Sequence, residues 1–436
     1  MPFRSILVVA ALAGISTAHA QSEIPDPIFS AVPFDRWMTE GQQAHFRWSV
    51  HVDGAELSGH QRLQTRVEVQ VDGNELVSRR GHGQLVILIE FQDSAERVYR
   101  THGTLDLQDI KDEAGKSNIQ YFQDALVLPG DYRVGVAIFD AQTMEHSAVQ
   151  KPLHVNPLRN DPLPGAWKDL PAVELLHGAE PPDSWFLPYL TGRLQLPLTT
   201  RRPIHIEVLM NASPSGPSRG FSVGTVNNRN LANMLPALKV LSRIDAAGAG
   251  PNITLLDIPK RNVMFQQDAV RQLDWMRLRQ ALMEADPNKI DVRALEHSEQ
   301  NAQYFVEQVR QRLAADGSPE HTSDEPFHVL IILTAPMTFN SGENRHPIEL
   351  AGKPNGKVYY VRYHLPPERL PPPSTFESLS RMRRNNPRTA QPQAPAEAFD
   401  SLEPLLKPLQ PRLFEVYSPE QFRKALGSML DEIARL

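Results

Sequence analysis

The chain has 436 residues, with 45 lysines and arginines against 51 aspartates and glutamates, so its formal net charge is −6 at pH 7. This mild acidity argues against a nucleic-acid-binding surface. The absence of cysteine excludes disulfides and thiol chemistry.

Residues 1–20 have the features of a cleavable secretory signal peptide. Arg4 gives a positive start, the run from Ile6 to Ile15 is apolar, and Ala18-His19-Ala20 supplies the small residues of a cleavage site. The apolar run is too short to span a bilayer of ~30 Å. The segment therefore predicts a periplasmic or secreted protein without a membrane span after signal cleavage.

Residues 30–156 have the pattern of an all-β sandwich with immunoglobulin-like architecture. Residues 63–71 alternate between apolar and polar, residues 85–89 are continuously apolar, and turn residues recur between further expected strands at 98–107, 118–128 and 132–139. Asp72-Gly73-Asn74 is typical of a turn. Tyr132 follows the Leu128-Pro129-Gly130 corner, which is typical of a tyrosine corner, although an ordinary Pro-Gly turn is the alternative.

Residues 157–203 form a proline-dense segment with poor periodicity. Asp161-Pro162-Leu163-Pro164-Gly165 is incompatible with a helix or a central strand. Trp167 and the Trp185-Phe186 pair indicate that part of the segment packs. We expect a connector that lies on both domains.

Residues 204–436 alternate strand and helix patterns. Strands are expected at 204–210, 253–258, 327–333, 357–363 and 413–417, and helices at 231–241, 273–284, 299–313 and after Ser418. Ser418, Pro419 and Gln421 form the start signal of the last helix. This order predicts a doubly wound α/β domain with a mostly parallel sheet. Residues 365–411 are rich in proline and arginine, and we expect them to be a disordered insertion.

The ends of two expected strands resemble those of the von Willebrand factor A-type domain. The first reads Asn211-Ala212-Ser213-Pro214-Ser215, and another reads Thr334-Ala335-Pro336. In that family the first strand ends in Asp-x-Ser-x-Ser, which holds a divalent cation, and a second aspartate follows the fourth strand. The resemblance covers residues 204–436.

Both family aspartates are replaced in this chain. Asn211 and Ala335 stand at the aspartate positions, and a site of hydroxyls and one amide has no negative charge with which to bind Mg²⁺. The resemblance therefore implies a degenerate adhesion site that needs no metal or other cofactor. The expected binding surface consists of Asn211, Ser213, Ser215, Thr334 and Ala335.

These patterns predict a protein-binding or scaffold protein at the cell envelope, not an enzyme, with a protein partner that the sequence does not identify. An alternative is a serine hydrolase, because Gly220-Phe221-Ser222-Val223-Gly224 matches the Gly-x-Ser-x-Gly motif around Ser222. The sequence does not select its acid and base among several candidates, which are Asp286, Asp291, His297, His328 and His364. A further alternative is carbohydrate binding by the sandwich through Trp37, Phe46 or Trp48, which are otherwise core residues.

Overall fold

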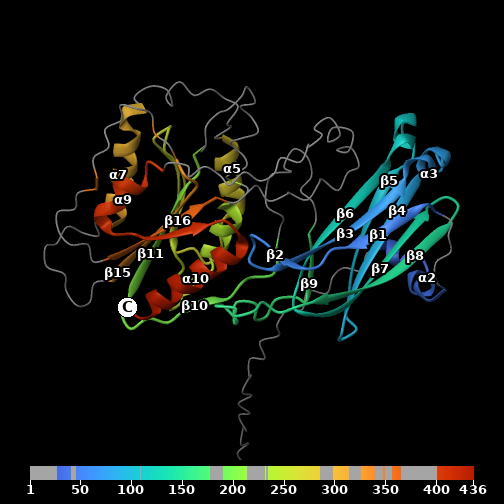
Figure 1. Cartoon of the computed structure of the whole chain (residues 1–436), viewed down its shortest axis with the longest axis horizontal. Coiled ribbons are helices and arrows are strands. Elements are labelled where there is room, and N and C mark those ends of the chain that lie inside the picture. Colours follow the sequence, from blue (N-terminus) through green and yellow to red (C-terminus); the bar gives the residue numbers. More distant parts are fainter. Residues whose placement is uncertain are drawn as a thin grey trace, which may run out of the picture.

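A computed structural model describes residues 27–40, 46–108, 110–176, 190–213, 231, 234–284, 298–313, 326–337, 339, 347–348, 356–364 and 400–436. Antiparallel sheets form one end of the molecule, drawn in blue to teal, and a mixed sheet with helices forms the other (Figure 1). The expected signal peptide, residues 1–20, lies outside the described residues. Within them, no helix is long and apolar enough to cross a membrane.

The N-terminal region consists of two antiparallel sheets, which confirms the expected all-β class. One sheet has the order β1-β3-β6-β9, with β2 paired to β3, and the other has the order β5-β4-β7-β8. Val67 and Val69 share one buried cluster with Ile87 and Ile89 of the opposite sheet. The strands are β1 (Trp48–Val52), β2 (Glu56–Leu57), β3 (Leu63–Asp72), β4 (Gln84–Asp93), β5 (Val98–Asp106), β6 (Asn118–Val127), β7 (Gly130–Asp140), β8 (His146–Val155) and β9 (Val173–Leu176).

The continuous apolar run in β4 is explained by burial on both faces. Ile87 and Ile89 face the core between the sheets. Leu88 instead packs in a second cluster with Phe34 and Trp37. These aromatic residues come from helix α2 (Phe34–Glu40), which follows the short helix α1 (Pro27–Ala31).

The expected turn at residues 72–74 is instead the start of a short helix, α3 (Gly73–Ser78). The Asp72 carboxylate accepts hydrogen bonds from the backbone N–H groups of Asn74 at 2.8 Å and Glu75 at 3.2 Å. This is an N-cap, which satisfies donors that the first helical turn leaves free. A 3-10 helix, η1 (Asp112–Lys116), packs against it so closely that a Cβ on Gly73 would lie 1.8 Å from the Ala114 carbonyl oxygen.

The tyrosine corner is present. The Tyr132 hydroxyl donates to the carbonyl of Leu128 at 2.8 Å and lies 3.2 Å from the carbonyl of Ala172. Because Ala172 belongs to the connector, this one side chain fixes the corner between β6 and β7 and also the approach to β9.

The C-terminal region contains a mixed sheet with the order β14-β13-β11-β15-β16-β17. Strand β14 is antiparallel to β13, and the other pairs are parallel. The sequence patterns did not predict β14. The strands are β11 (Ile204–Asn211), β13 (Asn252–Asp257), β14 (Asn262–Gln267), β15 (Phe327–Thr334), β16 (Gly356–Tyr363) and β17 (Arg412–Val416).

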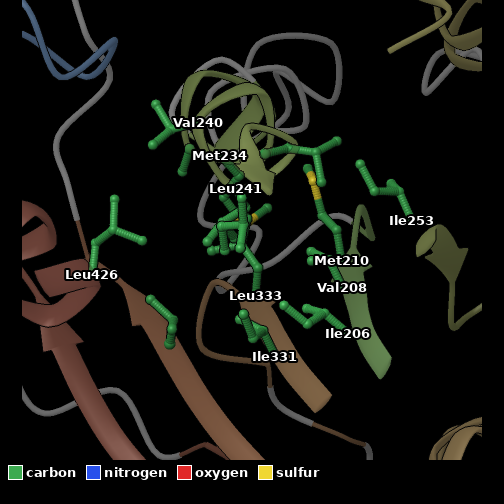
Figure 2. Packing of buried hydrophobic residues seen from close by; sticks show 14 of the residues in the cluster. Ile206, Val208, Met210, Met234, Val240, Leu241, Ile253, Ile331, Leu333 and Leu426 are labelled. Carbon is green, nitrogen blue, oxygen red and sulfur yellow. The ribbon is translucent and has the colours of Figure 1, made fainter. Parts of the chain in front are cut away.

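Both faces of this sheet are buried. Val208, Met210 and Leu333 belong to one cluster, together with residues of the helical segment 234–241 and of α10 (Pro419–Ala434) (Figure 2). Helix α5 (Trp275–Glu284) adds to this cluster. Leu209 and Ile332 belong to a cluster on the opposite face, with residues of α7 (Asn301–Leu313), which follows η2 (Ser298–Gln300).

The predicted start of α10 is confirmed. The Ser418 hydroxyl accepts from the Gln421 N–H at 3.3 Å, and the Gln421 side chain accepts from the Tyr417 N–H at 2.6 Å.

The predicted C-terminal boundary of the disordered insertion, residue 411, is wrong. Residues 400–411 are ordered, with α9 (Glu403–Leu406) and η4 (Lys407–Leu409). Leu402, Leu405 and Leu406 are buried against the face that α7 covers. The prolines around these leucines obscure their apolar spacing in the sequence. The remaining positions, 365–399, lie outside the described residues.

The connector contributes strands to both regions. Strand β9 pairs with β6 of the sandwich, while β10 (Leu196–Leu198) pairs in parallel with β12 (Ile244–Ala246). Arg423 of α10 is buried, and its Nε and Nη2 donate to the Asp161 carboxylate at 2.6 and 2.8 Å. Gln61 of the sandwich donates to the Pro419 carbonyl at 3.0 Å. Buried polar contacts therefore join the two regions.

Candidate functional site

Two of the predicted binding residues lie where β11 and β15 end. The strands are parallel, with Met210 opposite Leu333, so Asn211 and Thr334 follow at the same edge of the sheet. The Asn211 side-chain Nδ2 donates to the Thr334 Oγ1 at 3.1 Å. The two strand ends therefore lie side by side at the carboxyl edge.

The polar atoms at these strand ends bind one another. Asn211 Oδ1 accepts from the backbone N–H of Ser213 at 3.1 Å and from its hydroxyl, which in turn accepts from the Ile258 N–H at 2.8 Å. The Thr334 hydroxyl donates to the Ala335 carbonyl at 2.7 Å. Asn211 and Ser213 are only 2 % exposed and Thr334 is fully buried. The group ties together the ends of β11, β13 and β15.

These residues do not fit a divalent cation. Mg²⁺ prefers carboxylate oxygens and dehydrates reluctantly. Here Asn211 offers one amide oxygen that already accepts two hydrogen bonds, and its N–H group makes the link to Thr334. Across the described ranges, no group of three or more acidic, histidine or cysteine side chains could hold a metal. Ser215 lies outside those ranges.

A second polar group lies beside the first at this edge and is organised by Asp400. The Asp400 Oδ1 accepts from the backbone N–H groups of Met337 and Leu402, both at 3.2 Å. Its Oδ2 accepts from the Tyr360 hydroxyl at 2.5 Å and from Arg362 Nη1 at 3.1 Å. Asp400 thereby fastens the segment before α9 to β16.

Arg362 connects this carboxylate to the last strand. Its Nε donates to Glu415 Oε2 at 3.0 Å, and its Nη1 donates to Glu403 at 2.8 Å. His364 Nε2 lies 2.5 Å from Glu415 Oε2. The ring of Tyr417 stacks on His364 with 4.4 Å between centroids, yet Tyr417 remains 46 % exposed. The edge thus presents one exposed aromatic side chain on a fixed base.

The ionisation of these groups follows from their contacts. Burial opposes the charge of Arg362, but hydrogen bonds to Glu415 and Asp400 outweigh it and raise the Arg362 pKa above its ordinary value. Burial likewise opposes ionisation of Glu415, yet hydrogen bonds from Arg362 and His364 lower its pKa. Burial and the neighbouring Asp400 raise the Tyr360 pKa well above its ordinary value. Tyr360 is therefore a neutral donor and Arg362 a permanent cation.

Met337 joins the two groups. Its sulfur lies 3.5 Å from Asn211 Nδ2, and its carbonyl accepts from the Ser401 N–H at 2.7 Å. We use the term carboxyl-edge network for the joined set Asn211, Ser213, Thr334, Met337, Tyr360, Arg362, Asp400 and Glu415. The second half of the network is not predictable from the motif at the strand ends, because Asp400 lies within residues 365–411, which are expected to be a disordered insertion. The available signal was Asp400-Ser401 directly before the apolar spacing of α9.

The residues proposed for a hydrolase are not brought together in the described chain. His328 lies near the amino end of β15, opposite His205, whereas His364 lies just beyond the carboxyl end of β16. These two histidines therefore lie at opposite edges of the sheet. The remaining candidates lie outside the described residues: Ser222, Asp286, Asp291 and His297.

Two of the three sandwich aromatics are buried. Trp37 is 4 % exposed and stacks on His146 at 4.2 Å, and Phe46 is 6 % exposed beneath the Arg79 guanidinium at 4.1 Å. Trp48 is partly buried beside the core between the sheets. Sugar stacking needs an open aromatic face, so Trp37 and Phe46 are core residues and not a carbohydrate platform.

Comparison with known proteins leaves the family open. No family model matches this sequence, and no curated protein matches it. A solved structure described as the X-ray structure of Northeast Structural Genomics Consortium target SoR45 is similar at 13 % sequence identity. The match covers 26 % of this chain and 88 % of that chain, with a TM-score of 0.17.

Proposed function

We propose that this chain is an exported protein-binding or scaffold protein of the cell envelope, with a doubly wound, von Willebrand A-like domain that works without a metal ion. The observation that carries the proposal is the hydrogen bond from Asn211 Nδ2 to Thr334 Oγ1. It uses a neutral amide to join the strand ends that a cation would join in the family. The expected signal peptide at residues 1–20 would deliver the protein to the periplasm or beyond.

The architecture supports this assignment. The sheet order β14-β13-β11-β15-β16-β17, with helices against both faces, is the arrangement expected of a wound α/β domain. The preceding antiparallel sheets and the Tyr132 corner support an immunoglobulin-like sandwich. In wound sheets, ligands meet the carboxyl ends of the strands.

The carboxyl edge is the surface that we propose for the partner. Tyr417 is exposed there and is held by His364, which Glu415 and Arg362 fix in turn. An exposed aromatic residue on a rigid base is typical of an interface anchor, because it adds contact area at little cost in conformational entropy.

Site-specific photocrosslinking in the exporting cell tests this proposal. A photoreactive amino acid would replace Tyr417, which is 46 % exposed, or Met144 in the sandwich, which is 45 % exposed and serves as the matched control. We expect a discrete protein adduct from position 417, none from position 144, and an unchanged yield in the presence of a metal chelator. Equal adducts at both positions, or loss of the adduct with chelator, would contradict the proposal.

An esterase assay tests the non-enzymatic part of the proposal. We expect negligible ester hydrolysis by the purified chain and no change in the Ser222→Ala variant. Hydrolysis that depends on Ser222 would show that the chain is an enzyme.

A further inference from the structure

The turn between β2 and β3, residues 58–62, reaches from the sandwich to the C-terminal region, and we call it the junction turn. Ser58 donates to the Arg62 carbonyl from its backbone N–H and from its hydroxyl, both at 2.9 Å, and the Gln61 N–H donates to the Ser58 carbonyl at 2.9 Å. Gln61 is fully buried and has a φ of 59°. A glutamine with positive φ carries backbone strain, which persists only where the surrounding structure holds it in place.

The connector and α10 hold the junction turn at Gln61. Its side-chain Nε2 donates to the Pro419 carbonyl at 3.0 Å. Its carbonyl accepts from Trp167 Nε1 at 2.8 Å and from Arg423 Nη1 at 3.3 Å. The Arg423 guanidinium in turn lies 4.7 Å from the centre of the Trp167 ring. Polar contacts around one strained residue therefore fasten the sandwich to the C-terminal region.

Other polar atoms of the junction turn are buried without partners. His60 Nδ1, Gln61 Oε1, and Nε and Nη2 of Arg62 have no hydrogen-bond partner among the described residues. Burying such atoms costs free energy, which water would return if the turn were released. Three adjacent residues therefore oppose the intact junction, and the contacts of Gln61 act against them.

His60 lies among cations from both regions. It is 7 % exposed and lines a small cavity together with Arg62 of the junction turn and with Lys239 and Arg243 of the C-terminal region. Glu174 of β9 is the carboxylate that acts on this group, because it pairs with Arg62 and its charge acts on Lys239. The cations thus outnumber the carboxylate, and a proton on His60 would add a further positive charge.

Burial and the neighbouring cations keep the His60 ring neutral in the intact junction. Burial and the charges of Lys239 and Arg62 lower the His60 pKa from 6.5 to about 3. Burial opposes ionisation of Glu174, yet the charge of Arg62 and its hydrogen bond lower the Glu174 pKa, so this carboxylate stays charged. In water the ring would titrate at its ordinary value of 6.5. Between these two pKa values the released junction binds a proton that the intact one does not, so each pH unit of acidification favours release about tenfold.

We propose that the junction turn is an acid-sensitive latch: a proton on His60, beside Arg62 and Lys239, releases the turn from the connector and α10 while both regions stay folded. The cores support this, because the cluster between the sandwich sheets is distinct from the clusters on the two faces of the mixed sheet. Release also hydrates the buried atoms of residues 60–62 that lack partners in the described chain. The latch is separate from the carboxyl-edge network and does not depend on the proposed protein partner.

Acidification of the full mature chain tests the proposal. The chain has no cysteine, so Met144→Cys in the sandwich and Met276→Cys in α5 would give two labelling sites for fluorescence energy transfer. These positions are 45 % and 70 % exposed. From about pH 7 to about pH 4, we expect the transfer efficiency to change and the radius of gyration from X-ray scattering to rise, while far-UV circular dichroism stays constant. No change in either measurement, or loss of the dichroism signal over the same pH range, would overturn the proposal.

Variants at two histidines assign the effect to His60. His60→Gln stays neutral at every pH, so release should lose its dependence of about tenfold per pH unit. His154→Gln is the matched control, because the His154 side chain is 66 % exposed in its pair with Asp131. It should release the turn at the same pH as the unmodified chain does. Release of His60→Gln at that same pH would overturn the assignment.

Two further measurements keep the test valid if His60→Gln does not fold. Lys239→Gln removes a cation that opposes the protonated ring, so the midpoint of release should move to lower pH. Trp167 reports release in the unmodified chain, because its indole N–H loses the Gln61 carbonyl. Its emission should change with the same midpoint as the energy transfer, and this change should be absent in Trp167→Phe. An unmoved midpoint in Lys239→Gln, or constant Trp167 emission through release, would contradict the proposal.

Discussion

The two polar clusters of this protein differ in whether the chain satisfies its own hydrogen-bonding groups. In the carboxyl-edge network, Asn211, Ser213, Thr334 and Asp400 bind one another or the backbone. At the junction between the regions, Arg62 keeps two buried donors, Nε and Nη2, without a partner among the described residues. Buried polar groups are normally paired. Full pairing therefore indicates a structural role for the polar atoms of the network themselves.

The largest loss of stability is expected when the buried ion pair between Arg423 and Asp161 is removed. Arg423→Ala would leave the Asp161 carboxylate, which is 13 % exposed, without its two strongest donors. Loss of one partner from a buried pair costs about 4 kcal/mol. Denaturant unfolding of the full chain should show this loss in the free energy of unfolding.

The control for this change is Arg36→Ala, because the Arg36 side chain is 74 % exposed in its pair with Glu40. Exposed pairs contribute less than about 1 kcal/mol. A similar loss in both variants would mean that the contact between the regions is not tightly packed.

The next effect concerns the amide that closes the carboxyl-edge network. Asn211→Asp removes the donor to Thr334 and buries a negative charge, and we expect a loss of about 3 kcal/mol at neutral pH. Burial raises the pKa of such a carboxyl, so the loss should diminish as pH falls and the acid is protonated. Chemical unfolding at several pH values measures this.

Adding a second acid, at position 335, tests whether the network lacks only the negative charge that a metal ion needs. Mg²⁺ should leave the Tm of the unmodified chain unchanged. In the double variant Asn211→Asp with Ala335→Asp, Mg²⁺ should raise the Tm, because two carboxylates supply the charge that the neutral residues lack. Metal stabilisation of the unmodified chain would contradict the closed network.

The buried imidazole of His60, which lies near Arg62 and Lys239, predicts a pH dependence of stability. Burial lowers the His60 pKa from 6.5 to about 3, so between these values the unfolded chain binds a proton that the folded chain does not. Stability should therefore fall as pH falls from 6.5, by at most about 1.4 kcal/mol per pH unit from this residue. The slope should become smaller in His60→Gln. An unchanged slope would show that His60 is solvated.

The smallest effect is expected at the tyrosine corner. Tyr132→Phe removes a hydrogen bond of 2.8 Å to the Leu128 carbonyl and should cost about 1 kcal/mol. Tyr417→Phe, at an exposed residue, is the control and should change the free energy of unfolding very little. A larger loss in Tyr417→Phe would show that its hydroxyl is structurally engaged.

Local sequence patterns predicted many helices and strands, but they could not predict which side chains pair across long sequence separations. Alternation and capping residues located β3, β11, β15 and α10 to within a residue or two. The pairing of Arg423 with Asp161 spans 262 positions, and that of Arg62 with Glu174 spans 112. No local pattern encodes such contacts, since they depend on how the folded regions meet. Helix α2 was not predicted, because its apolar residues pack on the face of β4 that points away from the core between the two sheets.

Local sequence patterns also could not predict how the connector between the two regions packs. Prolines and poor periodicity marked residues 157–203 as a connector. Within it, however, β9 joins a sheet of the sandwich, and β10 forms a separate two-stranded sheet with β12 of the C-terminal region. Its Ala166 and Leu170 also belong to the core around β11. Proline density thus marks irregular backbone here and does not mark an independent linker.

The measurement that tests the metal-free carboxyl-edge network most directly is the Tm of the full mature chain, recorded with magnesium chloride and with sodium chloride at equal ionic strength. We predict that Mg²⁺ causes no shift in Tm beyond that with sodium chloride. A saturable rise in Tm with Mg²⁺ would contradict this prediction, because the polar atoms of the carboxyl-edge network would then be free to bind a cation.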